Sequence, residues 1–142
     1  MLIREVGISS VYMGRLGHGT DLLEELTRVC IDKNVTLGRV EAVGAVRNAT
    51  LGYYDQENRT YEFTVHSKPC EILNLTGNVS IRDGRPFVHA HVSLADHSGT
   101  AFGGHLAPGT TVFACEYVVQ AFTGDTLVRE ADAETGLPLW GE

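Results

Sequence analysis

One short segment of the chain has the spacing of an amphipathic helix, whereas most of the later apolar segments have the spacing of β-strands. The helix is predicted within residues 18–34, HGTDLLEELTRVCIDKN. Its apolar residues recur at helical spacing: Leu22, Leu23, Leu26, Val29 and Cys30. Thr20 or Asp21 can cap its N-terminus, and Glu24 completes a capping box if Asp21 is the cap.

The remaining apolar segments alternate with polar residues or are rich in Val, Ala and Gly, as strands are. Strands are expected within residues 5–15, 36–55, 61–66, 70–81, 85–96 and 109–122. Asp83-Gly84 is a turn signal between two of them. We therefore expect an α+β fold, a mainly antiparallel or mixed β-sheet with one well-defined helix, as a single domain over residues 1–142. The apolar residues within 137–140 are expected to dock on this domain or on a neighbouring subunit.

Composition limits the classes of protein to which the chain can belong. The net charge is −7 and no Lys/Arg cluster offsets it, so direct nucleic-acid binding is not expected. Arg4 and Glu5 interrupt the first apolar stretch, which is unlike a secretory signal, and no apolar run reaches the roughly 18 to 20 residues of a membrane span. The three cysteines form no Cys-x-x-Cys pair, which argues against a disulfide framework or a thiolate zinc site. The expected location is the cytoplasm, with no membrane partner.

Two histidines, His89 and His91, are separated by a single alanine in the strand expected within residues 85–96. Residues two apart in a strand point to the same side, about 6 to 7 Å apart at the backbone. The opposite face is expected to be apolar and to pack on the core: Val88, Ala90, Val92 and Leu94. The two imidazoles are therefore close enough to bind one metal ion.

A third histidine, His105, joins them if the next hairpin has a particular register. A three-residue loop over 97–99, with Gly99 in the left-handed conformation, pairs Asp96 with Thr100 and hence His91 with His105. A slip of one residue sends His105 to the other face. Three neutral imidazoles leave one coordination position open, the pattern of a catalytic metal site. Polar strand histidines on a solvated face are the alternative, and the spacing alone leaves both interpretations open.

Two carboxylates are candidates for catalytic groups beside this cluster. Glu116 lies in an otherwise uncharged apolar strand, where a buried carboxylate has to be paired, hydrogen-bonded or protonated. It is therefore a candidate general acid or base or a partner of a ligand histidine, although an ion pair with an arginine explains it equally well. Glu71 opens another strand and is a second candidate for the same region.

Several segments in a specific order resemble the plants and prokaryotes conserved (PPC) domain. The resemblance covers nearly the whole chain and is carried by residues 19–35 (GTDLLEELTRVCIDKNV), 41–55 (EAVGAVRNATLGYYD), 71–80 (EILNLTGNVS), 89–106 (HAHVSLADHSGTAFGGHL) and 112–119 (VFACEYVV). In plants this domain follows an AT-hook in DNA-binding proteins and mediates self-association. The present sequence has no Arg-Gly-Arg-Pro hook core, and only Gly84-Arg85-Pro86 echoes it.

The resemblance implies a homotrimer with an α+β fold similar to that of acetolactate decarboxylase. That enzyme holds its metal by a His-x-His pair and a downstream histidine, a set that His89, His91 and His105 match. The resulting hypothesis is a homotrimer that binds a divalent metal, expected to be zinc, with a lyase or hydrolase reaction on a small-molecule substrate. The alternatives are a non-catalytic oligomerisation or regulatory module associated with DNA-binding proteins, and a DNA-binding protein itself.

Overall fold

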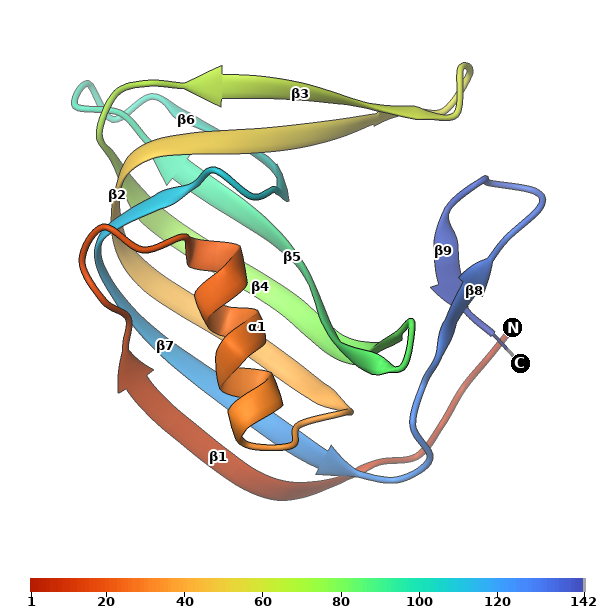
Figure 1. Ribbon diagram of the computed structural model, residues 1–142. Helices are drawn as coiled ribbons and strands as arrows, with labels where there is room; N and C mark the ends of the chain where they lie inside the picture. The colour runs from red at the N-terminus through yellow and green to blue at the C-terminus, as the bar shows by residue number, and fades with distance from the viewer. Residues whose placement is uncertain (142) are drawn as a thin grey trace.

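Residues 1–141 are described by a computed structural model, and their secondary structure confirms the predicted α+β class (Figure 1). The helix is α1 (Leu22–Asp32). The strands are β1 (Gly7–Arg15), β2 (Gly38–Asp55), β3 (Thr60–His66), β4 (Cys70–Arg82), β5 (Arg85–Ala95), β6 (Ala101–Leu106), β7 (Thr111–Thr123), β8 (Arg129–Ala131) and β9 (Pro138–Trp140). Asp83 and Gly84 form the predicted turn between β4 and β5, with φ of 52° and 74°.

The main sheet is antiparallel and bends back on itself through its longest strand. Its strand order is β1-β7-β2-β4-β5-β6, and β3 pairs with β2 outside this path. Gly38, at the start of the 18-residue β2, lies opposite Val79 of β4. Gly52, near its end, lies opposite His105 of β6. Because β2 pairs with both β4 and β6, the sheet closes through β2, β4, β5 and β6, which brings the end of β2 next to β6.

Helix α1 covers one face of this sheet (Figure 1). The N-cap of α1 is Asp21, one of the two residues predicted for this position. Oδ1 of Asp21 accepts a hydrogen bond from the Glu24 N–H at 3.0 Å. Leu22 and Leu26 are fully buried against the sheet, where such burial stabilises the fold by about 1.5–3 kcal/mol per side chain. No helix within residues 1–141 combines the length and the apolar character needed to cross a membrane.

Strand β5 has the two faces predicted from its alternation. Val88, Ala90, Val92 and Leu94 are all buried in the core, on the side of α1. His89 and His91 therefore project from the opposite face. The same strand thus provides both core packing and polar side chains on the far side of the sheet.

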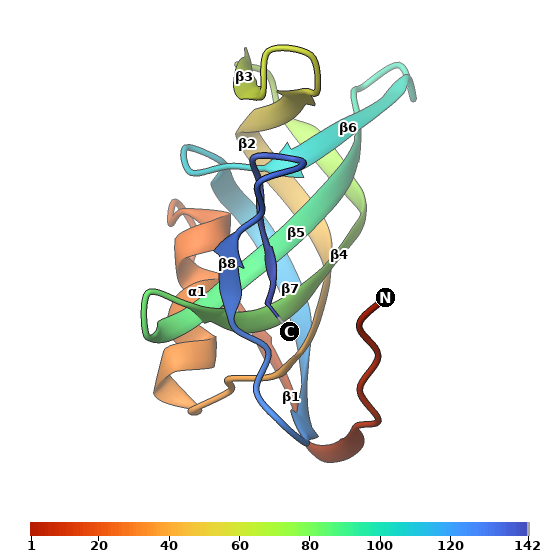
Figure 2. The ribbon, with the colours of Figure 1, turned by 90° about the vertical axis from the view of Figure 1, so that its right-hand side faces the viewer.

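The C-terminal segment docks on the chain's own sheet. β8 and β9 form a hairpin in which Arg129 lies opposite Trp140. The N–H of Ile81 in β4 donates to the carbonyl of Leu127 at 2.9 Å, which anchors the start of this hairpin. Figure 2 shows the hairpin in front of β4 and β5. The hairpin therefore forms one wall of the space in front of the histidines.

Candidate metal centre

His91 of β5 and His105 of β6 lie directly opposite each other, which confirms the predicted register. The loop between the strands sets this register. The N–H of Asp96 donates to the Thr100 carbonyl at 3.2 Å, and Gly99 has a φ of 80°, a conformation that glycine adopts without steric cost. His89 precedes His91 by two residues, so the three imidazoles lie on one face of the sheet.

The three rings are close enough to share one ion. Ring centroids are 5.3 Å apart for His89 and His91, 5.0 Å for His89 and His105, and 5.6 Å for His91 and His105. One possible ligand atom from each residue lies within 4.8 Å of those of the other two. His89 and His105 are half-buried and His91 is exposed. The cluster is thus anchored within the molecule and open on one side.

The chemistry of the cluster fits a metal ion, because metal ligands have to be neutral imidazoles. Burial, and then the charge of Arg129, lowers the pKa of His89 to about 4. Burial, and then the neighbouring His91, lowers the pKa of His105. Nδ1 of His105 is buried and has no hydrogen-bond partner among the described residues. A buried polar atom normally has a hydrogen-bond partner. A bound ion or a water molecule would provide the partner that Nδ1 of His105 lacks.

Gly52 and Tyr61 form one wall beside His105. The Tyr61 ring lies 5.0 Å from the His105 ring, centroid to centroid. A Cβ atom on Gly52 would lie 3.2 Å from a ring carbon of Tyr61 and 3.5 Å from Cβ of His105. The absence of a side chain at position 52 therefore lets the tyrosine of β3 pack closely against the histidine of β6.

Arg129 of β8 connects the C-terminal hairpin to His89. Its Nε–H donates to the fully buried Ser80 Oγ at 2.9 Å, and its Nη2 donates to the Asn78 Oδ1 at 2.8 Å. Nη2 also lies 3.3 Å from Nδ1 of His89. Because a guanidinium has only donors, Nδ1 of His89 is the acceptor, and the neutral ring carries its proton on Nε2.

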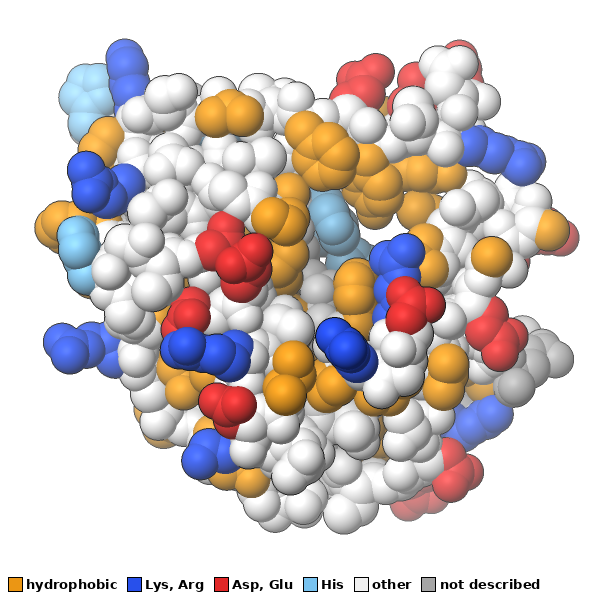
Figure 3. Space-filling model, in the orientation of Figure 1, with side chains coloured by type: hydrophobic (Ala, Val, Ile, Leu, Met, Phe, Trp, Pro, Cys, Tyr) orange, Lys and Arg blue, Asp and Glu red, His pale blue; other side chains and the backbone are white. Residues whose placement is uncertain are grey.

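Cavities adjoin the cluster on several sides. One of about 690 Å³ is lined by all three histidines together with residues of β2, β3 and the C-terminal hairpin. A second, of about 350 Å³, is lined by His89, His105 and Arg129 among others. Figure 3 shows histidine side chains inside a hollow of the surface, bordered by hydrophobic and basic side chains. A small molecule can therefore reach the imidazoles.

Comparison with known proteins identifies the family to which this site belongs. The sequence model of the Plants and Prokaryotes Conserved domain (abbreviated PCC or PPC) matches residues 3–123. The chain belongs to the PPC domain family. A structure of a PPC protein from Pyrococcus horikoshii is 33% identical and superposes with a TM-score of 0.93, covering 100% of this chain and 98% of that one. This confirms the family resemblance seen in the sequence.

Two other relatives of this PPC domain are informative. A protein from Archaeoglobus fulgidus described as metal-containing is 40% identical, with a TM-score of 0.95 and full coverage of both chains. A bifunctional protein GlmU from Synechococcus sp. (strain JA-3-3Ab) is 36% identical over 132 residues, which are 92% of this chain. The chain spans only 20% of the length of that curated relative.

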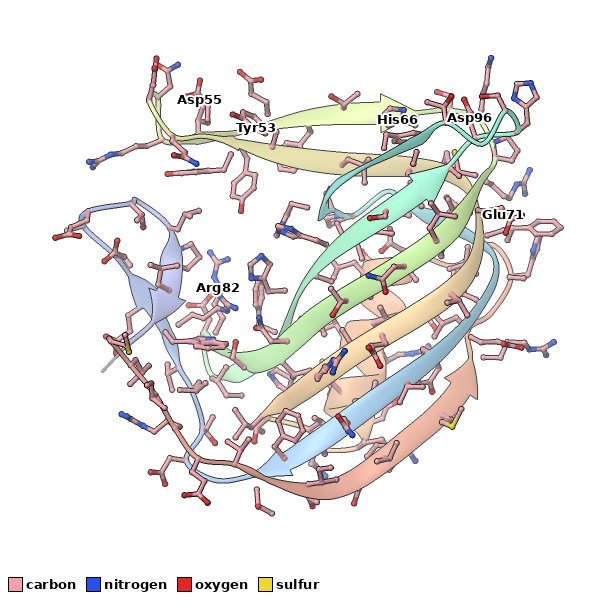
Figure 4. All side chains as sticks on the ribbon, turned by 180° about the vertical axis from the view of Figure 1, so that it is seen from behind. Tyr53, Asp55, His66, Glu71, Arg82 and Asp96 are labelled. Carbon is pink, nitrogen blue, oxygen red and sulfur yellow. The ribbon has the colours of Figure 1, made fainter. Side chains whose placement is uncertain are left out.

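The two candidate carboxylates of this PPC domain lie away from the histidines. Glu71 is exposed and lines a different cavity with Arg47 and His97. Figure 4 shows Glu71 at the end of the sheet opposite to Arg82. Glu116 lines a cavity on the outer face of β1, β2 and β7. Its side chain is exposed, so the expectation of a buried carboxylate in this apolar strand was wrong. Neither residue lines the cavities that the three histidines share.

Arg129 and Tyr61 are the residues of the site that the sequence analysis missed. Arg129 lies 40 positions after His89 in the sequence, in the C-terminal segment whose structure the residue pattern defines least. Tyr61 was visible only as one residue of an alternating strand. Neither stands in a local motif with the histidines, and only the pairing of distant strands brings them together.

Proposed function

We propose that this PPC domain binds one divalent metal ion, zinc, through His89, His91 and His105. The convergence of three imidazoles on one face, with ligand atoms within 4.8 Å of one another, is the observation that carries the proposal. The unpartnered Nδ1 of His105 and the lowered pKa of His89 support it. Three imidazole ligands without a thiolate are typical of catalytic zinc sites.

We further propose that the site acts on a small molecule in a lyase or hydrolase reaction. A divalent ion bound there supplies a Lewis acid that polarises a carbonyl group or activates water. The chain's own residues would hold the substrate: the cavity of about 690 Å³ provides space at the imidazoles, and Tyr61 excludes water from one side of it. A purely regulatory module has no need of such an accessible cavity at its metal site.

The same proposal includes assembly into a homotrimer. Met13 of the edge strand β1 and Val43 of β2 are exposed and line one cavity on the outer face of the sheet. Exposed apolar patches of this kind are typical of association surfaces. Sedimentation equilibrium is expected to give the mass of a trimer, which Met13→Glu lowers and Arg28→Glu, on the exposed side of α1, does not. A monomeric mass for the unaltered chain contradicts this assembly.

Metal analysis of protein purified without an affinity tag tests the metal site. We expect about one zinc ion per chain, and loss of most of it in His89→Ala and in His105→Ala. His97→Ala is the matched control, because His97 is exposed in the loop after β5 and lies outside the cluster. Equal zinc content in the His89→Ala and unaltered proteins would rule out the proposed ligand set.

A further inference from the structure

The cavity of about 350 Å³ beside His89 and His105 has an unusual distribution of charge. Three arginines line it, Arg59, Arg82 and Arg129, and no Asp or Glu among the described residues does. The chain as a whole carries a net charge of −7, so this concentration of positive charge is not a consequence of its composition. A surface of one sign that faces a cavity attracts ligands of the opposite sign.

Arg129 is a half-buried cation held in place by neutral groups. It donates hydrogen bonds to Ser80, Asn78 and the Pro138 carbonyl, at 2.9, 2.8 and 2.8 Å. No carboxylate within residues 1–141 forms a salt bridge with it. Burial, and then the charge of Arg82, lowers the pKa of Arg129. A buried charge without a counter-charge is costly, and a bound anion removes that cost.

The other two arginines are only weakly neutralised. Arg82 lies 3.7 Å from a carboxylate oxygen of Asp83, whose side chain is 93% exposed, so solvent screens this pair. Arg59 donates from Nη1 to the carbonyl of Ala133 at 3.2 Å and forms no salt bridge with a described carboxylate. Its charge is the smallest of the causes, after the hydrogen bonds from Thr135, that lower the pKa of Asp132. In the adjoining cavity that contains all three histidines, the acidic side chain is that of Glu134, which is exposed on the C-terminal hairpin.

Aromatic and apolar side chains complete the walls of the arginine cavity. Phe87 lines this cavity, and the Arg129 guanidinium lies 5.3 Å from the centre of its ring. The Trp140 ring is 5.9 Å from the same guanidinium and lines a neighbouring cavity with His89 and His91. Leu137 and Leu139 line the arginine cavity. A site with fixed cations and apolar walls suits an organic molecule with one anionic group better than a free inorganic ion.

We propose that the cavity lined by Arg59, Arg82 and Arg129 binds the carboxylate or phosphate group of a small organic anion, next to the three histidines. Guanidinium groups recognise the oxygens of both anions through charge-assisted hydrogen bonds. This names the substrate class of the proposed function. The inference rests on that function only for the reaction that follows binding, because the contacts that hold the three arginines are all with protein groups.

Binding to metal-stripped protein tests the inference separately from the metal site. The probes are butyrate, its neutral isostere butyramide, and propyl phosphate. Calorimetry measures the binding. Trp140, the only tryptophan of the chain, lies 5.9 Å from the Arg129 guanidinium, and its fluorescence is a second readout of changes at that arginine. We expect saturable binding of at least one of the two anions and none of butyramide, and the anion that binds identifies the recognised group.

Arginine variants decide whether this cavity is the site. Arg129→Met and Arg82→Gln are expected to weaken binding of the anion by about tenfold or more, as the loss of a charged hydrogen bond does. Arg47→Met, in the cavity that contains Glu71, is expected to bind it as the unaltered chain does. Arg82 is exposed, so Arg82→Gln still tests the inference if Arg129→Met does not fold. Equal binding of butyrate and butyramide, no anion binding, or unaltered affinity in the folded arginine variants overturns it.

The two proposals can fail independently of each other. Anion binding in a chain that never takes up metal supports this inference and contradicts the metal site. If the chain binds metal but neither its metal-free nor its metal-bound form binds the two anions, the metal site is supported and this inference is contradicted.

Discussion

Nη2 of Arg129 lies 3.3 Å from Nδ1 of His89, so the guanidinium donates a hydrogen bond to one of the two ring nitrogens of this candidate metal ligand. With the proton on Nε2, His89 has no free lone pair to offer a metal ion in this arrangement. Metal binding therefore has to displace either this hydrogen bond or the Nε2 proton. The positive charge of Arg129 also repels the incoming ion. Both effects oppose metal uptake at His89.

The first prediction follows from this contact between Arg129 and His89. Arg129→Gln removes the charge and provides an acceptor for a protonated Nδ1, so we expect zinc to bind roughly tenfold more tightly, the scale on which partners of metal ligands act. Competition with a chromophoric chelator measures the affinity, and thermal unfolding verifies the fold. Arg47→Gln is the control. A weaker affinity for zinc in a folded Arg129→Gln protein would show that Arg129 supports the site instead of opposing it.

A second prediction concerns the stability of the metal-free protein as the pH is lowered. The pKa of His89 is lowered from 6.5 to about 4 by folding, so between these values the unfolded chain takes up a proton that the folded chain does not. The free energy of unfolding should therefore decrease as the pH falls from about 6.5 towards about 4. Urea titrations across this range measure it. His89→Gln should reduce this dependence and leave the smaller part that comes from His105, whose pKa burial also lowers, whereas His97→Gln should leave it unchanged. A decrease as steep in His89→Gln as in the unaltered protein contradicts the assignment.

A third prediction tests how closely β5 and β6 approach each other. A Cβ atom on Gly103 would lie 2.4 Å from the carbonyl oxygen of Val92. Gly103→Ala is therefore expected to destabilise the protein by about 1–3 kcal/mol, as overpacking does, and to weaken metal binding by disturbing the pairing of His91 with His105. Urea unfolding and zinc titration measure the two effects. Ala101→Ser, at an exposed position of the same strand, should show neither.

A fourth prediction concerns the two carboxylates singled out in the sequence. Glu71 and Glu116 are exposed and lie outside the cavities that adjoin the three histidines. We therefore expect Glu71→Gln and Glu116→Gln to keep the zinc affinity of the unaltered protein in the chelator competition. A marked loss of affinity in either variant would mean that its side chain reaches the site in solution.

The sequence was most informative where local rules determine the structure. The Asp21 cap and the apolar stripe of α1 lie within a few residues of each other. The pairing of His91 with His105 depends on a three-residue loop, so strand alternation and turn geometry were sufficient to predict it. Both predictions depend on residues that are close together in the sequence, and the structure confirms both.

The environment of the histidines depends on contacts between distant parts of the chain and could not be derived in this way. Gly52 meets His105 only because the long strand β2 bends across the sheet to pair with β6. Arg129 reaches His89 only because the C-terminal hairpin packs on β4. The exposure of Glu116 likewise depends on which face of β7 is covered, and an apolar sequence around a charge does not reveal this.

Diffraction from crystals of untagged protein, measured on either side of the zinc absorption edge, shows directly whether the three histidines bind zinc. We expect an anomalous peak between His89, His91 and His105 that appears above the edge and vanishes below it. Well-defined density in which the three rings point apart and enclose no anomalous scatterer would contradict it.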